Sequence, residues 1–174
     1  KVGTDGKVSF YNNSGTIDLL ADVVGWFGTD GSKQGAAVQP LPPARVLDTR
    51  DGTGAPQAKV GAGQHIDLTV TNTGGVPATG VTAVVLNVTG VLPSNQTHIT
   101  VWPTGTTMPV ASSLNVSPGW IIPNLVVAKV GTDGKVSLYN NSGTIDLLAD
   151  VVGWFGADGS QQGAAVQPLP PARV

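Results

Sequence analysis

A long internal duplication constrains this sequence more than any other feature. Residues 129–174 repeat residues 1–46 at a constant offset of 128, without a gap, and the two stretches agree at 43 of 46 positions. The three differences are Phe10 against Leu138, Thr29 against Ala157 and Lys33 against Gln161. A fixed period of this length is typical of whole domains in tandem rather than of small solenoid turns. We therefore expect this chain to be part of a tandem array of domains, beginning and ending inside a repeat.

The composition favours strands and turns inside each repeat. A repeat of 128 residues is long enough to bury about two thirds of its unfolded surface, so it can fold as an independent domain. Every acidic residue is Asp and none is Glu, which removes a main helix former. The chain has no Cys, which excludes disulfides and thiolate metal sites.

The charge content excludes several classes of partner. Charged residues make up 11% of the chain and the net charge is -2, which gives no electrostatic footprint for nucleic acid or anionic lipid. The longest apolar runs fall far short of the roughly 20 residues that a membrane helix needs. We expect no nucleic-acid partner, no membrane insertion and no cofactor.

Alternating apolar and polar residues predict eight short strands. The predicted strands cover residues 45–50, 64–71, 81–91, 97–103, 112–117, 121–130, 135–141 and 144–155. No window has a helical period, and turn residues recur every 8 to 12 positions, so we expect an all-β chain folded as a β-sandwich with Greek-key or jelly-roll connections. A barrel is the alternative. Asp133 and Gly134 predict a tight hairpin between the sixth and seventh strands.

The duplication and the loop composition together define the expected domain boundaries. The Pro-rich run at residues 39–46 is typical of a semi-rigid connector, because proline holds the backbone extended. The expected division is residues 1–27 as the last two strands of a preceding repeat, 28–40 as a linker, 41–155 as one complete sandwich, 156–168 as a second linker and 169–174 as the start of the next repeat.

The chain contains two copies of the last two predicted strands but only one complete set of the first six, so the two copies compete for the same place in the sandwich. The C-terminal copy is joined to the sixth strand by a tight turn, whereas the N-terminal copy must return through a linker of about a dozen residues. We expect the C-terminal copy to complete the sandwich. The N-terminal copy then presents an unpaired apolar face, which belongs to a neighbouring domain in an array or could dock by strand exchange on a second molecule. This strand-exchange segment carries Val8, Phe10, Ile17, Leu19, Val23, Trp26 and Phe27.

Four charged residues form the most conspicuous polar constellation. Period two places Asp48 with Arg50 on one face of the first strand, and Asp146 with Asp150 on one face of the last, together with Trp154. We expect an Arg50–Asp150 ion pair that ties the first strand to the last and fixes their register. Paired carboxylates could also indicate glycoside hydrolysis, but no cleft of aromatic and polar residues can be assembled around them.

Other polar residues give weaker signals. The Asp and Gly residues of the run 48–54 invite a calcium interpretation, but turn chemistry explains them and no terminal Glu is present, so we expect no metal site. His65 and His98 are isolated on their strands and fit surface or satisfied core positions. No nucleophile motif is found, and we expect no enzyme.

The tryptophans divide into two groups. Trp26 and Trp154 are equivalent positions in the duplication and are expected to cap the core. Trp102 lies at a strand end and Trp120 in a turn, where an indole could stack on a sugar ring. The alternative for both is an aromatic plug that closes one end of the sandwich.

The motifs of the whole repeat resemble those of a tandem domain found in secreted and cell-surface proteins of actinobacteria and some other bacteria. The distinctive parts are LDTR at residues 47–50 and ADVVGWF at residues 149–155. The resemblance implies an extracellular or cell-surface, non-catalytic module: a stalk, adhesin or filament subunit that joins neighbouring copies head to tail through β-strand contacts or short Pro-rich connectors. A carbohydrate or cell-wall binding module appended to a secreted enzyme is the alternative.

Overall fold

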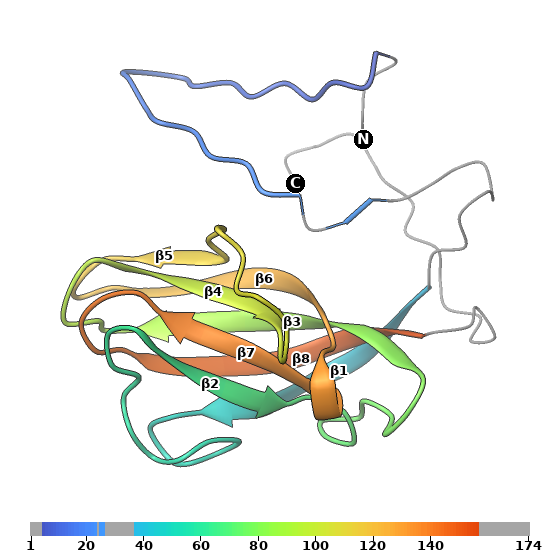
Figure 1. Ribbon diagram of the computed structural model, residues 1–174. Helices are drawn as coiled ribbons and strands as arrows, with labels where there is room; N and C mark the ends of the chain where they lie inside the picture. The colour runs from blue at the N-terminus through green and yellow to red at the C-terminus, as the bar shows by residue number, and fades with distance from the viewer. Residues whose placement is uncertain (1–4, 24, 27–36, 157–174) are drawn as a thin grey trace.

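The computed structural model describes residues 5–23, 25–26 and 37–156, and these residues include eight strands in two sheets (Figure 1). The strands are β1 (Val38–Asp48), β2 (Gln64–Thr69), β3 (Val81–Val91), β4 (Thr97–Pro103), β5 (Leu114–Val116), β6 (Ile121–Lys129), β7 (Lys135–Asn140) and β8 (Asp146–Gly156). A single 3₁₀ turn, Thr132–Gly134, precedes β7. Within the described residues, no helix has the length and apolarity to cross a membrane.

The two sheets have four strands each, in the orders β1-β8-β3-β6 and β2-β7-β4-β5. Every paired ladder is antiparallel. This alternation, in which successive strands mostly change sheet, is the jelly-roll order. The expectation of an all-β, eight-stranded sandwich is confirmed at this level.

The core lies between the inner faces of the two sheets. Val84, Leu86 and Val88 of β3 point into it at alternate positions, as do Val136 and Leu138 of β7 from the opposite sheet. Both strands are internal in their sheets, so their inward residues are covered from every side. The alternation that the sequence shows for β3 and β4 therefore reflects real burial, and their observed bounds match the expected ones.

The Pro-rich run is part of the first strand and not a connector, which corrects the last three residues of the expected linker at 28–40 and the start of the domain at residue 41; residues 28–36 lie outside the described residues. β1 begins at Val38, opposite Phe155 of β8, and contains Pro40, Pro42 and Pro43. β1 is an edge strand, and the register of its ladder shifts between Pro40 and Ala44. Edge positions and bulges are where a strand tolerates residues without an N–H, so prolines do not exclude a strand here.

The sixth and seventh strands do not form the expected hairpin. β6 pairs with β3 in one sheet, whereas β7 pairs with β2 and β4 in the other. The turn between them, with Asp133 at φ 57° and Gly134 at φ 70°, carries the chain across the sandwich. The Asp-Gly pair correctly indicates a sharp turn, but the turn residues do not determine which sheet the next strand joins.

A bulge in β8 reverses which face its side chains occupy. Leu147, Ala149 and Val151 lie in the core, and the ladder to β3 then skips a residue, so that Val85 is opposite Gly153 and Leu86 is opposite Val151. Trp154 therefore joins the core side, whereas strict alternation from Asp146 predicts the outer side. Its role as a core residue is as expected, but its shared face with the two aspartates is wrong.

Among the described residues of the two copies, those of the C-terminal copy alone are built into the sandwich. We call residues 135–156, which contain β7 and β8, the closing segment, and residues 7–28 its duplicate. The described residues of the duplicate form no strand and lie outside both sheets in Figure 1. Val8 is 58% exposed and Leu19 61%, whereas their counterparts Val136 and Leu147 are fully buried. The expectation that the C-terminal copy closes the sandwich agrees with this arrangement; Phe27 and residues 169–174 lie outside the described residues.

The chain enters and leaves the sandwich at the same end. Val38, the first residue of β1, is opposite Phe155, next to the last residue of β8. Figure 1 shows the start of β1 and the end of β8 side by side on the right of the molecule. The loops after β1, β3, β5 and β7 all lie at the other end, because each ladder is antiparallel.

Candidate functional site

A cluster of charged side chains joins β1 to β8 on the outer face of their sheet. Arg45 donates from Nε to Asp150 Oδ1 at 2.6 Å and from Nη1 to Asp48 Oδ2 at 2.8 Å. Arg50 donates from Nε to Asp48 Oδ1 at 2.9 Å and from Nη2 to Asp48 Oδ2 at 2.7 Å, and its backbone N–H also bonds to Asp48 Oδ1. Asp48 is thus a buried carboxylate held between two arginines.

The expected Arg50–Asp150 pair is wrong, because Asp150 is bound by Arg45 and Arg50 is bound by Asp48. A bulge explains the error. Arg45 is opposite Asp150, but the next paired residue is Leu47, opposite Ala149, so the alternation of β1 shifts by one. Arg45 and Asp48 consequently share a face although they are three residues apart. Period two excluded Arg45, and nothing in the sequence around it announces the bulge.

Asp146, at the start of β8, belongs to a separate pair. Its carboxylate accepts a hydrogen bond from Thr49 Oγ1 at 3.0 Å and an ion pair from Lys59. Thr49 Oγ1 in turn accepts from the backbone N–H of Leu147 at 3.1 Å. These bonds tie the loop after β1 to the first residues of β8. Asp146 therefore holds the start of β8, whereas Asp48 holds the end of β1 through the two arginines.

The arginines keep Asp48 ionised. Hydrogen bonding from Arg50 lowers the pKa of Asp48 from 3.8 to about 2, with further charge stabilisation from Arg45. The same bonds raise the pKa of Arg50, through Asp48, and that of Arg45, chiefly through Asp150. A catalytic acid in glycoside hydrolysis needs a raised pKa, so the lowered pKa of Asp48 does not suit that role.

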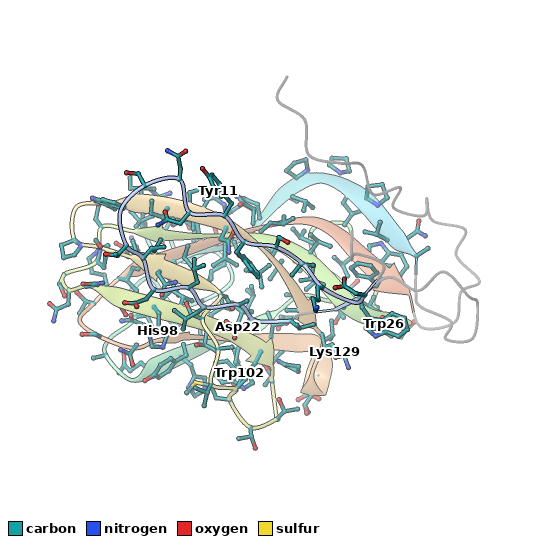
Figure 2. All side chains as sticks on the ribbon, turned by 90° about the horizontal axis from the view of Figure 1, so that it is seen from above. Tyr11, Asp22, Trp26, His98, Trp102 and Lys129 are labelled. Atoms are coloured by element: carbon teal, nitrogen blue, oxygen red, sulfur yellow. The ribbon has the colours of Figure 1, made fainter. Side chains whose placement is uncertain are left out.

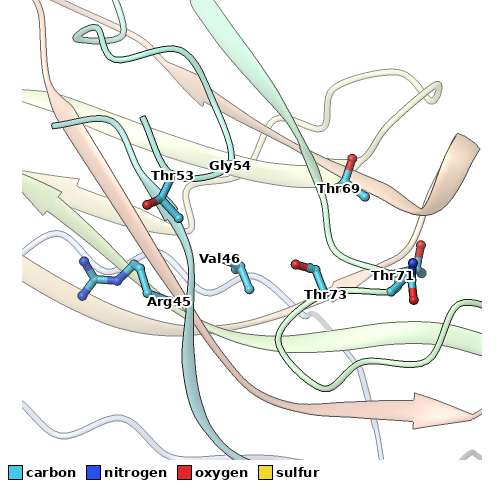
Figure 3. Close-up of a pocket in the computed structure, with 8 residues that line it drawn as sticks. Arg45, Val46, Thr53, Gly54, Thr69, Thr71 and Thr73 are labelled. Carbon is cyan, nitrogen blue, oxygen red and sulfur yellow. The ribbon is translucent and has the colours of Figure 1, made fainter. Parts of the chain in front are cut away.

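A cavity of about 540 Å³ adjoins this cluster (Figure 3). Its lining comprises Arg45, Val46, Thr53, Gly54, Thr69, Thr71, Asn72 and Thr73. Figure 3 shows the guanidinium of Arg45 directed away from Thr69, Thr71 and Thr73. It forms ion pairs with Asp150 and Asp48. The lining therefore combines polar side chains, four threonines and Asn72 among them, with the apolar side chain of Val46.

Turn chemistry accounts for the acidic residues after β1. The Oδ1 atom of Asp51 accepts a hydrogen bond from the backbone N–H of Thr53 at 2.9 Å, and Gly52 follows at φ 89°. Asp48 directs its oxygens to arginines rather than to an open site. Among the described residues, no group of three or more His or Asp side chains converges as a metal site would require.

Trp102 and Trp120 do not form one glycan-stacking site. Trp102 is only 8% exposed; its Nε1 donates to the backbone oxygen of Thr106 at 3.2 Å, and its ring centroid is 5.8 Å from that of His65. Trp120 is 58% exposed. Trp102 pairs near the start of β7, whereas Trp120 precedes β6 near the end of β3, so they lie at opposite ends of the sandwich. Trp102 is a packed residue, and its proposed stacking role is wrong.

A polar chain on the outer face of the second sheet escaped the sequence reasoning. Ser137 Oγ donates to Asp67 Oδ1 at 2.6 Å and lies 2.9 Å from Thr104 Oγ1, and the Nε2 atom of His65 lies 3.6 Å from Asp67 Oδ1. In a nucleophilic triad the imidazole stands between the hydroxyl and the carboxylate. Here the carboxylate stands between the hydroxyl and the imidazole, so the three side chains are not in the order of a nucleophilic triad.

Asn140 is the polar residue that fastens the closing segment inside the sandwich. It is fully buried; its Oδ1 accepts from Thr97 Oγ1 at 2.7 Å, and its Nδ2 donates to the backbone oxygens of Val60, Gly61 and Gly143. In the duplicate, Asn12 keeps the local bond, from Nδ2 to the Gly15 oxygen at 2.8 Å. Figure 2 shows Tyr11, Asp22 and Trp26 along this segment, which Figure 1 shows apart from both sheets.

Comparison with known proteins gives no assignment. No family model matches the chain, and no curated protein matches it. The candidate site is therefore defined by geometry alone: a closing segment that completes the fold, a charge cluster that locks its second strand, and an exposed duplicate of the same segment.

Proposed function

We propose that this chain is a non-catalytic structural repeat of an extracellular array, serving as a stalk, adhesin or filament subunit. The observation that carries the proposal is that the chain contains one framework, β1 to β6, but two near-identical closing segments. A framework can hold one closing segment, and the duplicate leaves large apolar side chains exposed. In an array with a period of 128, the duplicate closes the framework that precedes it.

The connection between successive sandwiches follows from the position of the strand ends. By the period of 128, Val166 corresponds in sequence to Val38, so in the proposed array nine residues, 157–165, would separate the end of β8 from the next β1. These nine residues reach at most about 30 Å when extended. Because the chain enters and leaves a sandwich at the same end, a linker of this length suits neighbouring sandwiches that lie side by side and are joined at that end. The other end of each sandwich then faces away from the linker.

The array proposal predicts that a preceding framework will bury the duplicate. The test is an extended chain in which residues 29–128 are added ahead of Lys1, so that the duplicate follows a framework directly. We expect peptides carrying Phe10 to change from rapid to slow backbone hydrogen exchange, because their N–H groups enter sheet ladders. Continued rapid exchange in this chain and in its F10L variant would overturn the proposal.

The extracellular location rests on the resemblance described above and is tested separately. An antibody against the folded sandwich should label intact cells that produce the parent protein, before any permeabilisation. Labelling that appears only after the cells are opened contradicts the surface location, while leaving the array arrangement unaffected.

Binding to carbohydrate or cell wall is a second proposal, and the exposure of Trp120 favours it. Leu92, 51% exposed, donates its backbone N–H to the Trp120 oxygen, and Ile121 is exposed beside them. An exposed indole can stack on a sugar ring. Pull-down on peptidoglycan or a glycan array should then lose its signal in Trp120→Ala and keep it in Trp102→Phe. If the two variants bind the peptidoglycan or the glycan array equally well, glycan binding through Trp120 is contradicted.

A further inference from the structure

The duplicate differs from the closing segment at one position, and that position is in the core. Residues 7–28 and 135–156 agree at every position except Phe10 against Leu138. Leu138 is fully buried in β7, opposite Ile66 of β2 and Val101 of β4. A larger side chain at a closely packed site forces its neighbours to move. The single difference between the copies therefore falls where side-chain size matters most.

The duplicate already has the turn that the closing segment uses. In the sandwich, Asn140 Nδ2 donates to the Gly143 oxygen, and Gly143 adopts a φ of 61°. In the duplicate, Asn12 Nδ2 donates to the Gly15 oxygen, and Gly15 adopts a φ of 68°. The bend between the two strands thus forms without the framework, which lowers the ordering that docking would require.

The framework can receive the duplicate without a change in topology elsewhere. Because Val38 is opposite Phe155, a duplicate in the place of the closing segment would put Phe27 opposite Val38. Residues 29–37 would then connect two antiparallel neighbours, as an ordinary loop does. The sandwich would be closed in a circularly permuted order, with residues 135–156 displaced.

We propose that this chain has two alternative closures, and that the side chain at positions 10 and 138 selects between them. The partner of the duplicate's apolar face is the β1–β6 framework of its own chain. This proposal goes beyond the array function, since it concerns which of two equivalent segments a single framework accepts. Leucine favours acceptance and phenylalanine opposes it.

The selection is decided by packing more than by chain connectivity. Five residues, 130–134, connect β6 to the closing segment, and nine residues, 29–37, connect the duplicate to β1. Loop closure over nine rather than five residues disfavours the permuted closure by only about twofold to threefold. Overpacking by a phenylalanine ring changes a folding equilibrium by about tenfold or more.

A rescue experiment tests this directly in the full chain. We expect Leu138→Phe to lower the urea midpoint of unfolding, because both available segments then carry phenylalanine. The added substitution Phe10→Leu should restore the midpoint to nearly that of the wild type, although residue 10 lies outside the sandwich in the wild-type structure. An unchanged midpoint in L138F, or a double variant as unstable as L138F, would overturn the proposal.

Hydrogen exchange identifies the segment responsible for the rescue. F10L/L138F has the composition of the wild type, and its two copies still differ in mass, so each can be followed. Slow exchange should move from residues 135–140 to residues 7–12, at every protein concentration. Rescue that requires high concentration and produces dimers contradicts closure within one chain. K33Q/Q161K, which exchanges a pair outside both segments, should leave the wild-type pattern unchanged.

The two proposals fail differently. If the rescue is absent but Phe10 peptides become protected in the extended chain, the array stands and the alternative closure falls. If the rescue succeeds while the extended chain leaves the duplicate unprotected, the alternative closure stands and the array falls.

Discussion

At the scale of single residues, Asp48 and Asn140 hold the closing segment in opposite sheets. Asp48 forms ion pairs with Arg45 and Arg50, and Arg45 also binds Asp150 of β8. Asn140 uses both of its amide atoms on partners from three other parts of the chain. Buried polar groups of this kind stabilise one arrangement of strands because any other leaves them unpaired.

The acid sensitivity of Asp48 gives the first prediction. Its pKa falls from 3.8 to about 2 on folding, so the ionised form stabilises the fold fully above pH 4 and loses this effect as the pH falls through about 2. Asp48→Asn should lower the free energy of unfolding by about 2 kcal/mol at pH 7. The deficit should shrink between pH 4 and pH 2 in urea titrations. A deficit that is constant over this interval contradicts the assignment.

Asn140 and Asn12 form a matched pair for the second prediction. Asn140→Ala leaves Thr97 and the buried backbone oxygens without their partner, so the free energy of unfolding should fall by about 2–3 kcal/mol. Asn12→Ala removes only a local bond in an exposed segment and should change it by less than about 0.5 kcal/mol. Equal losses in the two variants, measured by chemical denaturation, would show that both copies contribute to the core.

At this scale the sequence identifies the residue types but not all of their partners. Asp48, Arg50, Asp146 and Asp150 do gather near the junction of the first and last strands, where period two places them. The partners are exchanged because a bulge brings Arg45 onto the outer face. A bulge depends on how neighbouring strands fit together, which a single strand's pattern does not record.

At the scale of elements, three of the four edge strands have features that discourage pairing between folded sandwiches. The four edge strands are β1, β6, β2 and β5. β1 contains three prolines, β6 contains Pro123, and β5 has only three residues. Prolines and short lengths are common protections against edge-to-edge association. Within the proposed array, contact by addition of a strand to the β1, β5 or β6 edge is therefore disfavoured relative to a covalent link.

The third prediction concerns which element belongs to the core. Leu147 of β8 is fully buried and Leu19, its counterpart, is 61% exposed. Leu147→Ala should lower the free energy of unfolding by about 2–5 kcal/mol, because it removes packing and leaves a cavity. Leu19→Ala should change it by less than about 0.5 kcal/mol. Thermal or urea unfolding of the two variants makes the comparison, and a reversed order would contradict the structure.

Element boundaries follow from the sequence where burial alternates and fail where context decides. β3 and β4 are internal strands, and their bounds, Val81–Val91 and Thr97–Pro103, match the expected ones. The sequence predicts a connector over the Pro-rich first part of β1 because proline opposes internal strands, but an edge strand tolerates it. The predicted hairpin between β6 and β7 failed because both sheets were within reach of the same turn.

At the scale of the whole molecule, the chain enters and leaves the sandwich at the same end. This placement determines how a pulling force on the chain would act on β1 and β8. Tension between the start of β1 and the end of β8 pulls on two neighbouring antiparallel strands from the same side. Such a load opens the β1–β8 ladder one hydrogen bond at a time. A load applied between opposite ends of the sandwich must instead break many bonds together.

This geometry gives the fourth prediction, which the absence of cysteine makes simple to test. Handles attached through Ala37→Cys and Gly156→Cys should unfold the sandwich at a lower force than handles at Ala37→Cys and Asn95→Cys, which lies in the loop between β3 and β4 at the opposite end. Single-molecule pulling at one loading rate provides the comparison. A higher force for the same-end pair contradicts the strand placement.

The account depends on the claim that, of two nearly identical segments, residues 135–156 close the sandwich and residues 7–28 do not. Hydrogen exchange with mass spectrometry on the unmodified chain tests this claim most directly, because Phe10 and Leu138 give the two copies different masses. Peptides containing Leu138 should exchange slowly, and peptides containing Phe10 should exchange at the rate of exposed backbone. Equal protection of the two peptides, or slower exchange of the one containing Phe10, would contradict the account.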